Sequence, residues 1–149
     1  MTETATADRQ AWMGLLARAG AEDLARRWAA LDAPPAHDWL RAPETGTVML
    51  RGRAGATGAP FNLGEMTVTR ASVRLDCGAI GHAWVQGCGA DHARMAALAD
   101  ALMQTDRAGD IRARLLDPLA EAEAARRRQR AAKAAATKVE FFTMVRGEG

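Results

Sequence analysis

The chain has 149 residues, enough for one domain with a buried core. Hydrophobic residues make up 48% of it, but 35 of them are Ala, which suits helices that pack through small side chains and a modest sheet. A net charge of +2 excludes recruitment of nucleic acid or an anionic membrane through a strong overall field. The N-terminus lacks a signal-peptide pattern and no apolar run approaches the ~20 residues of a membrane span, so we expect a cytoplasmic protein.

The first third of the chain predicts two short helices. We expect residues 1–8 to be disordered and Asp8 to cap a helix that ends at Gly20. A second helix ends before the Pro34-Pro35 pair, which cannot continue it. Its apolar residues share one stripe: Leu24, Trp28 and Leu31. The two helices predict a helical hairpin.

Residues 37–88 change to strand patterns. Four segments qualify: HDWLRAP, TGTVMLRGR, GEMTVTRASVRLD and AIGHAWVQG. Turn signals separate them at residues 44–46, 54–60 and 76–78. This part of the chain therefore predicts an antiparallel meander of about four strands.

One of these segments changes the parity of its apolar residues. Met66 and Val68 share one face, whereas Val73 and Leu75 fall on the other. Because side chains of a strand alternate between its two faces, we expect a register slip near residues 69–71. This slip would set the direction of the Arg70 side chain.

The helical pattern returns after Gly89. Asp91 can cap one helix, and a last helix from Asp110 runs into the Ala- and Arg-rich segment EAEAARRRQRAAKAAATK. Pro118 predicts a kink or a break in it. We therefore predict a single α+β domain over residues 1–149: a helical hairpin, a meander, C-terminal helices and an extended tail.

The tail VEFFTMVRG holds two of the three Phe residues of the chain. It follows a helix that can bury only an Ala face, so we interpret residues 137–147 as a docking tail. The predicted docking residues are Phe141, Phe142, Met144 and Val145. We expect an extended strand that joins either its own sheet or a partner's.

Two arginine features are candidates for binding phosphate. The loop RGRAGATGAP places Arg51 and Arg53 among glycines, which suits an anion. However, phosphate-binding glycine loops lead from a strand into a helix, whereas this loop joins two strands, which favours a plain hairpin loop. Arg70 is the second candidate, although a structural ion pair with Glu65 is the simpler interpretation.

Metal binding and nucleic-acid binding are disfavoured. His82, Cys88 and His92 are too few and too poorly spaced for a zinc site, and no catalytic triad can be assembled from three His. The run Arg126–Arg130 lies after acidic residues and has no interleaved aromatic residues, which favours a solvated helix face. With no self-contained catalytic centre and several unpaired apolar features, the sequence favours a subunit of a larger assembly.

Long ordered segments resemble the PhnG family, the G subunits of the phosphonate C–P lyase system. They are RQAWMGLLARA, RAPETGTVMLRGRAGATGAPFNLGEMTVTRASVRL, GHAWVQG, DHARMAALADALMQ and VEFFTMVRG. The resemblance runs from about Arg9 to Gly147, nearly the whole chain. At residues 87–89 the chain reads GCG where the family shows G-R-D, so a universal charge pair there is not supported.

The resemblance implies an accessory subunit of a multi-subunit enzyme. It implies that the chain acts with H, I and L partners to make α-D-ribose 1-methylphosphonate 5-triphosphate from ATP and methylphosphonate, with release of adenine. It also implies a core of G, H, I and J subunits, two of each, in which the G subunit packs on the nucleosidase-like I subunit. ATP is then a substrate of the complex, and this chain itself binds no cofactor. A purely structural adaptor that stabilises the I subunit is the alternative.

Overall fold

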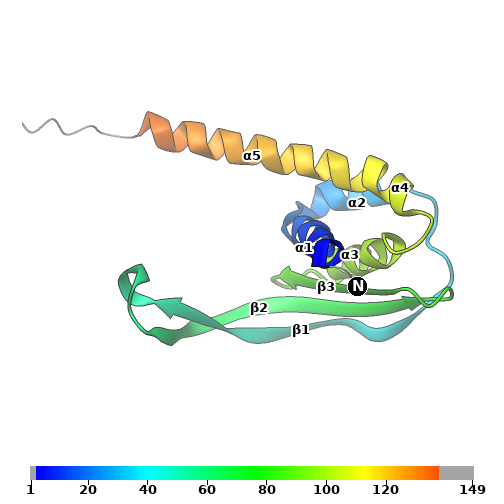
Figure 1. Ribbon diagram of the computed structural model, residues 1–149, viewed down its shortest axis with the longest axis horizontal. Helices are drawn as coiled ribbons and strands as arrows, with labels where there is room; N and C mark the ends of the chain where they lie inside the picture. Colours follow the sequence, from blue (N-terminus) through cyan, green and yellow to red (C-terminus); the bar gives the residue numbers. More distant parts are fainter. Residues whose placement is uncertain (1–2, 138–149) are drawn as a thin grey trace, which may run out of the picture.

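The computed structural model describes residues 3–137, which form one antiparallel sheet with helices on one of its faces (Figure 1). The sheet order is β1-β2-β3, from β1 (His37–Arg53), β2 (Pro60–Leu75) and β3 (Ile80–Gln86). A short 3₁₀ turn (Ala54–Ala56) joins β1 to β2, and the predicted turn at residues 76–78 joins β2 to β3. The predicted α+β class is therefore confirmed.

The sheet has three strands instead of four, because the first two predicted strands are one 17-residue strand, β1. The expected turn at residues 44–46 is wrong. Instead, pairing with β2 shifts between Trp39 and Arg41 and again between Arg41 and Glu44. Two bulges thus absorb the irregular residues, and β1 stays paired with the long β2 on both sides of them.

The expected register slip lies in β1, opposite the predicted place. β2 pairs with β3 without interruption from Val68 to Arg74, so the slip predicted near residues 69–71 of β2 is absent. A bulge in the central strand would disturb two ladders of hydrogen bonds, whereas one in the outer strand β1 disturbs only one.

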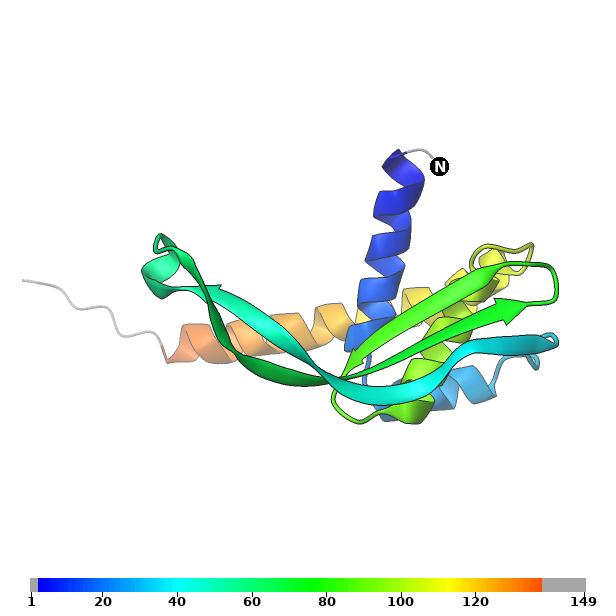
Figure 2. The same ribbon diagram turned by 90° about the horizontal axis from the view of Figure 1, so that it is seen from below.

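Half of β1 and half of β2 project from the sheet as an arm. Among the described residues, β2 pairs with β3 from Val68 onward, and the N–H of Gly87 donates to the backbone oxygen of Thr67, so Pro60–Met66 pairs with β1 alone. We call residues 46–67 the arm; it twists and extends well beyond the end of β3, about as far as the C-terminal helix of residues 117–136 reaches (Figure 2). Four of the arm's large apolar side chains are exposed: Met49, Leu50, Phe61 and Leu63.

The N-terminal pair of helices is present, with a corrected start. α1 (Glu3–Arg18) begins five residues before the predicted cap at Asp8, so residues 3–8 are helical and the expected disorder does not apply to them. α2 (Ala21–Ala29) buries Leu24 and follows directly after Gly20.

The core lies between the sheet and α3 (Ala90–Leu102), whose Ala-rich sequence permits close approach to β3. At Gly81 an added Cβ would lie 2.0 Å from the backbone oxygen of Ala97 and 2.5 Å from the nitrogen of Ala101. The largest fully buried core side chains come from helices and strands alike: Leu16, Leu24, Val73, Leu75, Leu102, Ile111, Leu115 and Leu119.

The last helical segments follow one another along one side of the molecule. α4 (Ala108–Ile111) leads into a π-helical turn (Arg112–Leu116) and then α5 (Asp117–Ala136). The irregularity predicted at Pro118 is this π-turn: proline lacks an N–H and crowds the carbonyl four residues earlier, and the wider turn accommodates it. The docking tail beyond Thr137 lies outside the described residues. Across residues 3–137 the helices are too short or too polar to cross a bilayer.

Candidate functional site: an arginine-lined cleft beside the arm

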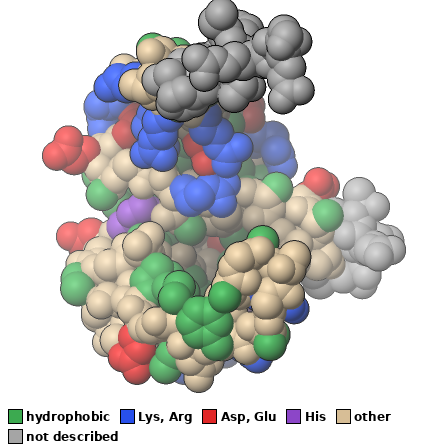
Figure 3. All heavy atoms as spheres, turned by 90° about the vertical axis from the view of Figure 1, so that its left-hand side faces the viewer, with side chains coloured by type: hydrophobic (Ala, Val, Ile, Leu, Met, Phe, Trp, Pro, Cys, Tyr) green, Lys and Arg blue, Asp and Glu red, His purple; other side chains and the backbone are tan. Residues whose placement is uncertain are grey.

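A cleft of about 830 Å³ opens where the arm leaves the sheet, between the strands and the helices. Figure 3 views this end of the molecule: Lys and Arg side chains gather above a hollow, and hydrophobic side chains lie on the strands below it. The cleft is formed by tertiary structure, since its lining comes from α1, the turn before α2, all three strands and α5.

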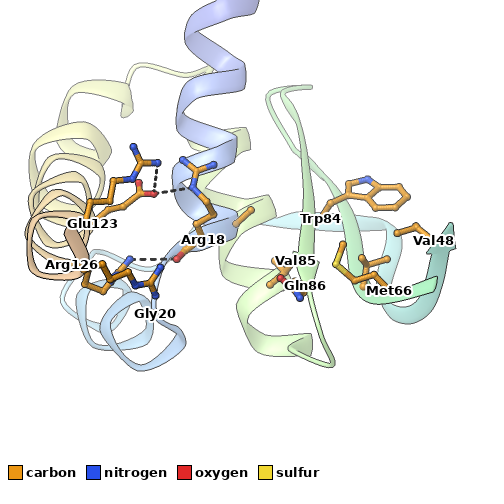
Figure 4. Close-up of a pocket in the computed structure, with 13 residues that line it drawn as sticks. Arg18, Gly20, Val48, Met66, Trp84, Val85, Gln86, Glu123 and Arg126 are labelled. Carbon is orange, nitrogen blue, oxygen red and sulfur yellow. Dashed lines mark hydrogen bonds and ion pairs between the residues drawn. The ribbon is translucent and has the colours of Figure 1, made fainter. Parts of the chain in front are cut away.

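One side of the cleft is basic, and we call it the arginine wall: Arg18, Arg126, Arg127 and Arg130. Glu123 is the acidic residue among the lining side chains. Arg18 Nε donates to Glu123 Oε1 over 2.9 Å, and Arg127 Nη2 donates to the same oxygen over 3.2 Å (Figure 4). Arg126 donates only a long 3.5 Å bond to the backbone oxygen of Arg18. With four arginines and one glutamate, the lining has a net charge of +3.

The pKa of Glu123 lies below its ordinary value. The largest cause is the hydrogen bond from Arg18, and the charges of Arg18, Arg127 and Arg126 act in the same direction. Partial burial opposes them because it disfavours the charged carboxylate. Glu123 therefore stays ionised at neutral pH and holds two members of the arginine wall in place.

The facing side is apolar, and we call it the apolar wall: Val48, Met66, Val68 and Trp84. Figure 4 shows Trp84, Met66 and Val48 across the cleft from Arg18 and Arg126. Trp84 is 51% exposed although it is one of the two tryptophans of the sheet, with Trp39. The guanidinium carbon of Arg70 lies 5.6 Å from the Trp84 ring centroid, within the range of a cation–π contact.

Arg70 is bound within the sheet. It donates from Nε to Glu44 Oε1 over 2.6 Å, and Arg41 pairs with the same carboxylate. The pKa of Glu44 is lowered, first by the hydrogen bond from Arg70 and then by that from Arg41. The structural ion pair expected for Arg70 is thus present, but its partner is Glu44, which the bulges of β1 bring opposite Arg70, and not Glu65.

Arg51 and Arg53 lie at the far end of the arm. Arg51 is exposed, and Arg53 Nη1 donates to the backbone oxygen of Gly58 over 3.0 Å, which closes the loop. Seven positions of β1 separate Arg51 from the partner of Arg70, roughly 23 Å at ~3.3 Å per residue. The three candidate phosphate ligands therefore do not form one cluster in this chain.

Both histidines among the other candidate ligands have structural partners. His82 Nδ1 lies 2.8 Å from Ser72 Oγ, and His92 Nε2 lies 2.8 Å from the backbone oxygen of Leu16. Cys88 is exposed and unbridged. Within residues 3–137 no three His, Cys, Asp or Glu side chains gather closely enough to hold a metal ion.

A buried carboxylate was missed by the sequence analysis. Asp100 is fully buried and accepts hydrogen bonds from Arg9 Nε (3.1 Å) and Nη2 (2.7 Å), Trp12 Nε1 (2.9 Å) and the backbone N–H of His82 (2.9 Å). It ties α1 and β3 to α3. The signal was available: Asp100 is a single acid in the apolar run AALADAL. The arginine wall was also missed, because Arg126–Arg130 was interpreted as solvated and only Arg128 of its arginines is absent from the lining.

Fold and site together define a small α+β protein with an exposed β arm and a basic cleft. The sequence profile of the family described as phosphonate metabolism protein PhnG matches residues 7–147. The chain is also 45% identical over 146 residues to α-D-ribose 1-methylphosphonate 5-triphosphate synthase subunit PhnG of Rhizobium meliloti (strain 1021), covering 98% of this chain and 94% of the relative. The chain belongs to the PhnG family.

Proposed function

We propose that the chain is an accessory subunit of α-D-ribose 1-methylphosphonate 5-triphosphate synthase in organic phosphonate catabolism. In this role it works with H, I and L partners to transfer the ribose triphosphate of ATP to methylphosphonate, with release of adenine. The observation that carries the proposal is the 45% identity with the Rhizobium meliloti subunit over nearly the full length of both chains.

The proposed partners rest on the same family relationship. The chain packs directly on the I-type subunit, in a cytoplasmic core complex that also contains H and J types, with two copies of each. ATP is a substrate of the complex, and no cofactor, nucleic acid or membrane is assigned to this chain. The arm supports a role in assembly, because four large apolar side chains on a two-stranded projection favour burial against another protein.

Displacing adenine at C1 of the ribose requires that water be excluded and that the phosphonate be held in line. An accessory subunit supplies both by covering the active site of its neighbour, and an arginine at the cover can bind phosphate groups. Arg51 and Arg53 suit this task because they sit at the end of the projecting arm. Arg70 suits it less, since it would have to leave Glu44.

Three single substitutions separate these arginines: Arg51→Ala, Arg53→Ala and Arg70→Ala in the assembled complex. The measured quantity is the partition between ribose triphosphate, the hydrolysis product, and the phosphonate adduct. We expect Arg51→Ala to increase hydrolysis most. A partition equal to wild type in all three variants would remove the phosphate-binding role and leave the accessory role untouched.

A structural adaptor that stabilises the I-type subunit is the second candidate, and the exposed apolar arm favours it. Removing residues 138–149 distinguishes the two. An adaptor loses complex yield while the product partition of the remaining complex stays constant, whereas an active-site cover changes the partition.

The central experiment is co-expression of the H-, I- and L-type subunits with and without this chain. Adenine release is measured with and without methylphosphonate. We expect methylphosphonate-dependent adduct only when the chain is present. Equal adduct formation in its absence contradicts the proposed function.

A further inference from the structure

The basic cleft has two unlike walls and an open strand edge beside them. The arginine wall carries the excess positive charge, and the apolar wall faces it across about 830 Å³. β3 ends at Gln86 while β2 continues to Pro60, and both Gln86 and Met66 line the cleft. The edge of β2 that β3 leaves unpaired therefore starts at the cleft, among the described residues.

These three features select a particular occupant. An open strand edge accepts an extended chain through main-chain hydrogen bonds. Side chains of an extended chain alternate between two sides, so one set would meet the apolar wall and the other the arginine wall. Carboxylates match the guanidinium groups of Arg126 and Arg130, which form no ion pair within residues 3–137.

We propose that the cleft binds an extended segment of a partner subunit in which apolar and acidic side chains alternate. The apolar side chains cover Trp84 and Met66, and the acidic side chains pair with Arg126 and Arg130. The inference rests on the proposed function for the existence of partner subunits, and it adds the place and the chemistry of one contact.

Two other occupants fit less well. The chain's own residues 138–149 carry Lys138, Arg146, Glu140 and Glu148, whose charges cancel, so they do not supply the excess of carboxylates that the cleft requires. A free polyphosphate would match the arginine wall but leave the apolar wall exposed to water.

The first test compares two arginines of the same helix. Both side chains are exposed, but Arg130 lines the cleft and Arg128 does not. In the full-length chain, Arg130→Glu is expected to weaken binding to the complex of the other subunits about tenfold or more, and Arg128→Glu less than about twofold. Thermal unfolding of both variants checks that the fold is retained. Equal affinities of the two variants would overturn the proposal.

The second test identifies the occupant. A photo-reactive phenylalanine replaces Met66, the complex is assembled and illuminated, and the cross-linked peptide is sequenced by mass spectrometry. We expect a peptide of another subunit with Asp or Glu at alternating positions. A cross-link to residues 138–149, a cross-link to a second copy of this chain, the absence of any cross-link, or its loss upon addition of inorganic triphosphate each overturns the proposal.

The same measurements separate this proposal from the proposed function. If the wild-type chain fails to bind the other subunits, the accessory role and the cleft proposal fail together. If the wild-type chain binds and supports the adduct while Arg130→Glu behaves like Arg128→Glu, only the cleft proposal fails.

Discussion

Asp100 organises the packing of three elements through one side chain. Its two oxygens accept from Arg9, Trp12 and the backbone of His82, so a single buried carboxylate satisfies donors on α1 and β3. Such a network costs stability when one member is removed, because the remaining groups stay buried without their partner.

The Asp100→Asn variant is therefore expected to lower the free energy of unfolding by about 2–4 kcal/mol, since it removes the charge opposite Arg9 and replaces an acceptor oxygen with a donor. Urea unfolding followed by circular dichroism measures this change. Asp106→Asn is the control, because Asp106 is exposed. A loss for Asp100→Asn no larger than the control's would contradict the assigned role.

Glu123 gives a pH-dependent prediction. Its pKa in the folded protein lies below the ordinary value of 4.5, so its contribution to stability is complete above pH 4.5 and is lost as pH falls through the lowered pKa. The Arg18→Ala variant removes the largest cause and is expected to raise the pKa of Glu123 toward 4.5. A carbon-detected NMR titration of the Glu123 carboxyl group measures the shift. An unchanged pKa would show that Arg18 does not hold this carboxylate.

Sequence patterns predict single residues unevenly. The helical stripe of Leu24 and the turn at residues 76–78 were predicted because neighbouring residues determine them. Arg70 was correctly interpreted as a structural ion-pair residue, but its partner was wrong. Glu44 comes opposite Arg70 only because two bulges in β1 shift the register, and pairing over 26 positions is not encoded locally.

At the scale of elements, β3 and α3 pack so closely that one position of β3 must be a glycine. Among the described glycines, an added Cβ comes nearest to other atoms at this position. Gly81 has no room for a Cβ, since backbone atoms of Ala97 and Ala101 occupy its place. Backbone cannot yield as a flexible side chain does, so any larger residue must move α3 away from the sheet.

Accordingly, Gly81→Ala is expected to destabilise the protein by about 1–3 kcal/mol or more through overpacking. Gly46→Ala is the matched control: it lies in a strand, and an added Cβ there meets no atom within 4 Å. Both are compared by their melting temperatures. Similar melting temperatures for the two variants would mean that α3 shifts without cost.

Element types were predicted better than element boundaries. Periodicity identified the helices and the strand region, yet β1 was divided in two because residues 44–46 carry a turn signal, whereas in the structure they pair with β2 directly after the two bulges between Trp39 and Glu44. Whether the chain turns or continues as a bulged strand depends on whether a partner strand continues past the irregular residues. That is a property of β2 and not of β1.

At the scale of the whole molecule, the arm and the helix-covered sheet are two parts with different surroundings. The apolar side chains of β2 and β3 that face the helices lie in the core, whereas those at the end of the arm are exposed. The cleft between the two parts combines residues from positions 17 to 130, so the sequence could not predict it.

Replacing residues 51–63 by a two-residue Asn-Gly turn, which keeps Leu50 opposite Gly64, tests this division. We expect the melting temperature to change by only a few degrees, because the removed residues contribute nothing to the buried core. Binding to the other subunits is expected to fall at least about tenfold. Retained binding would show that the arm is not a docking element, and a collapse of the melting temperature would show that it supports the fold.

The exposed strand edges also have a consequence for how much of the chain a cell can make. Backbone groups along β1 and along the outer half of β2 form a template that any extended polypeptide can match, including another copy of the same chain. Molecules produced in excess of whatever covers these edges are therefore prone to self-association. Balanced synthesis with its binding partners is then a requirement that the fold itself imposes, and solubility should depend on stoichiometry more than on temperature.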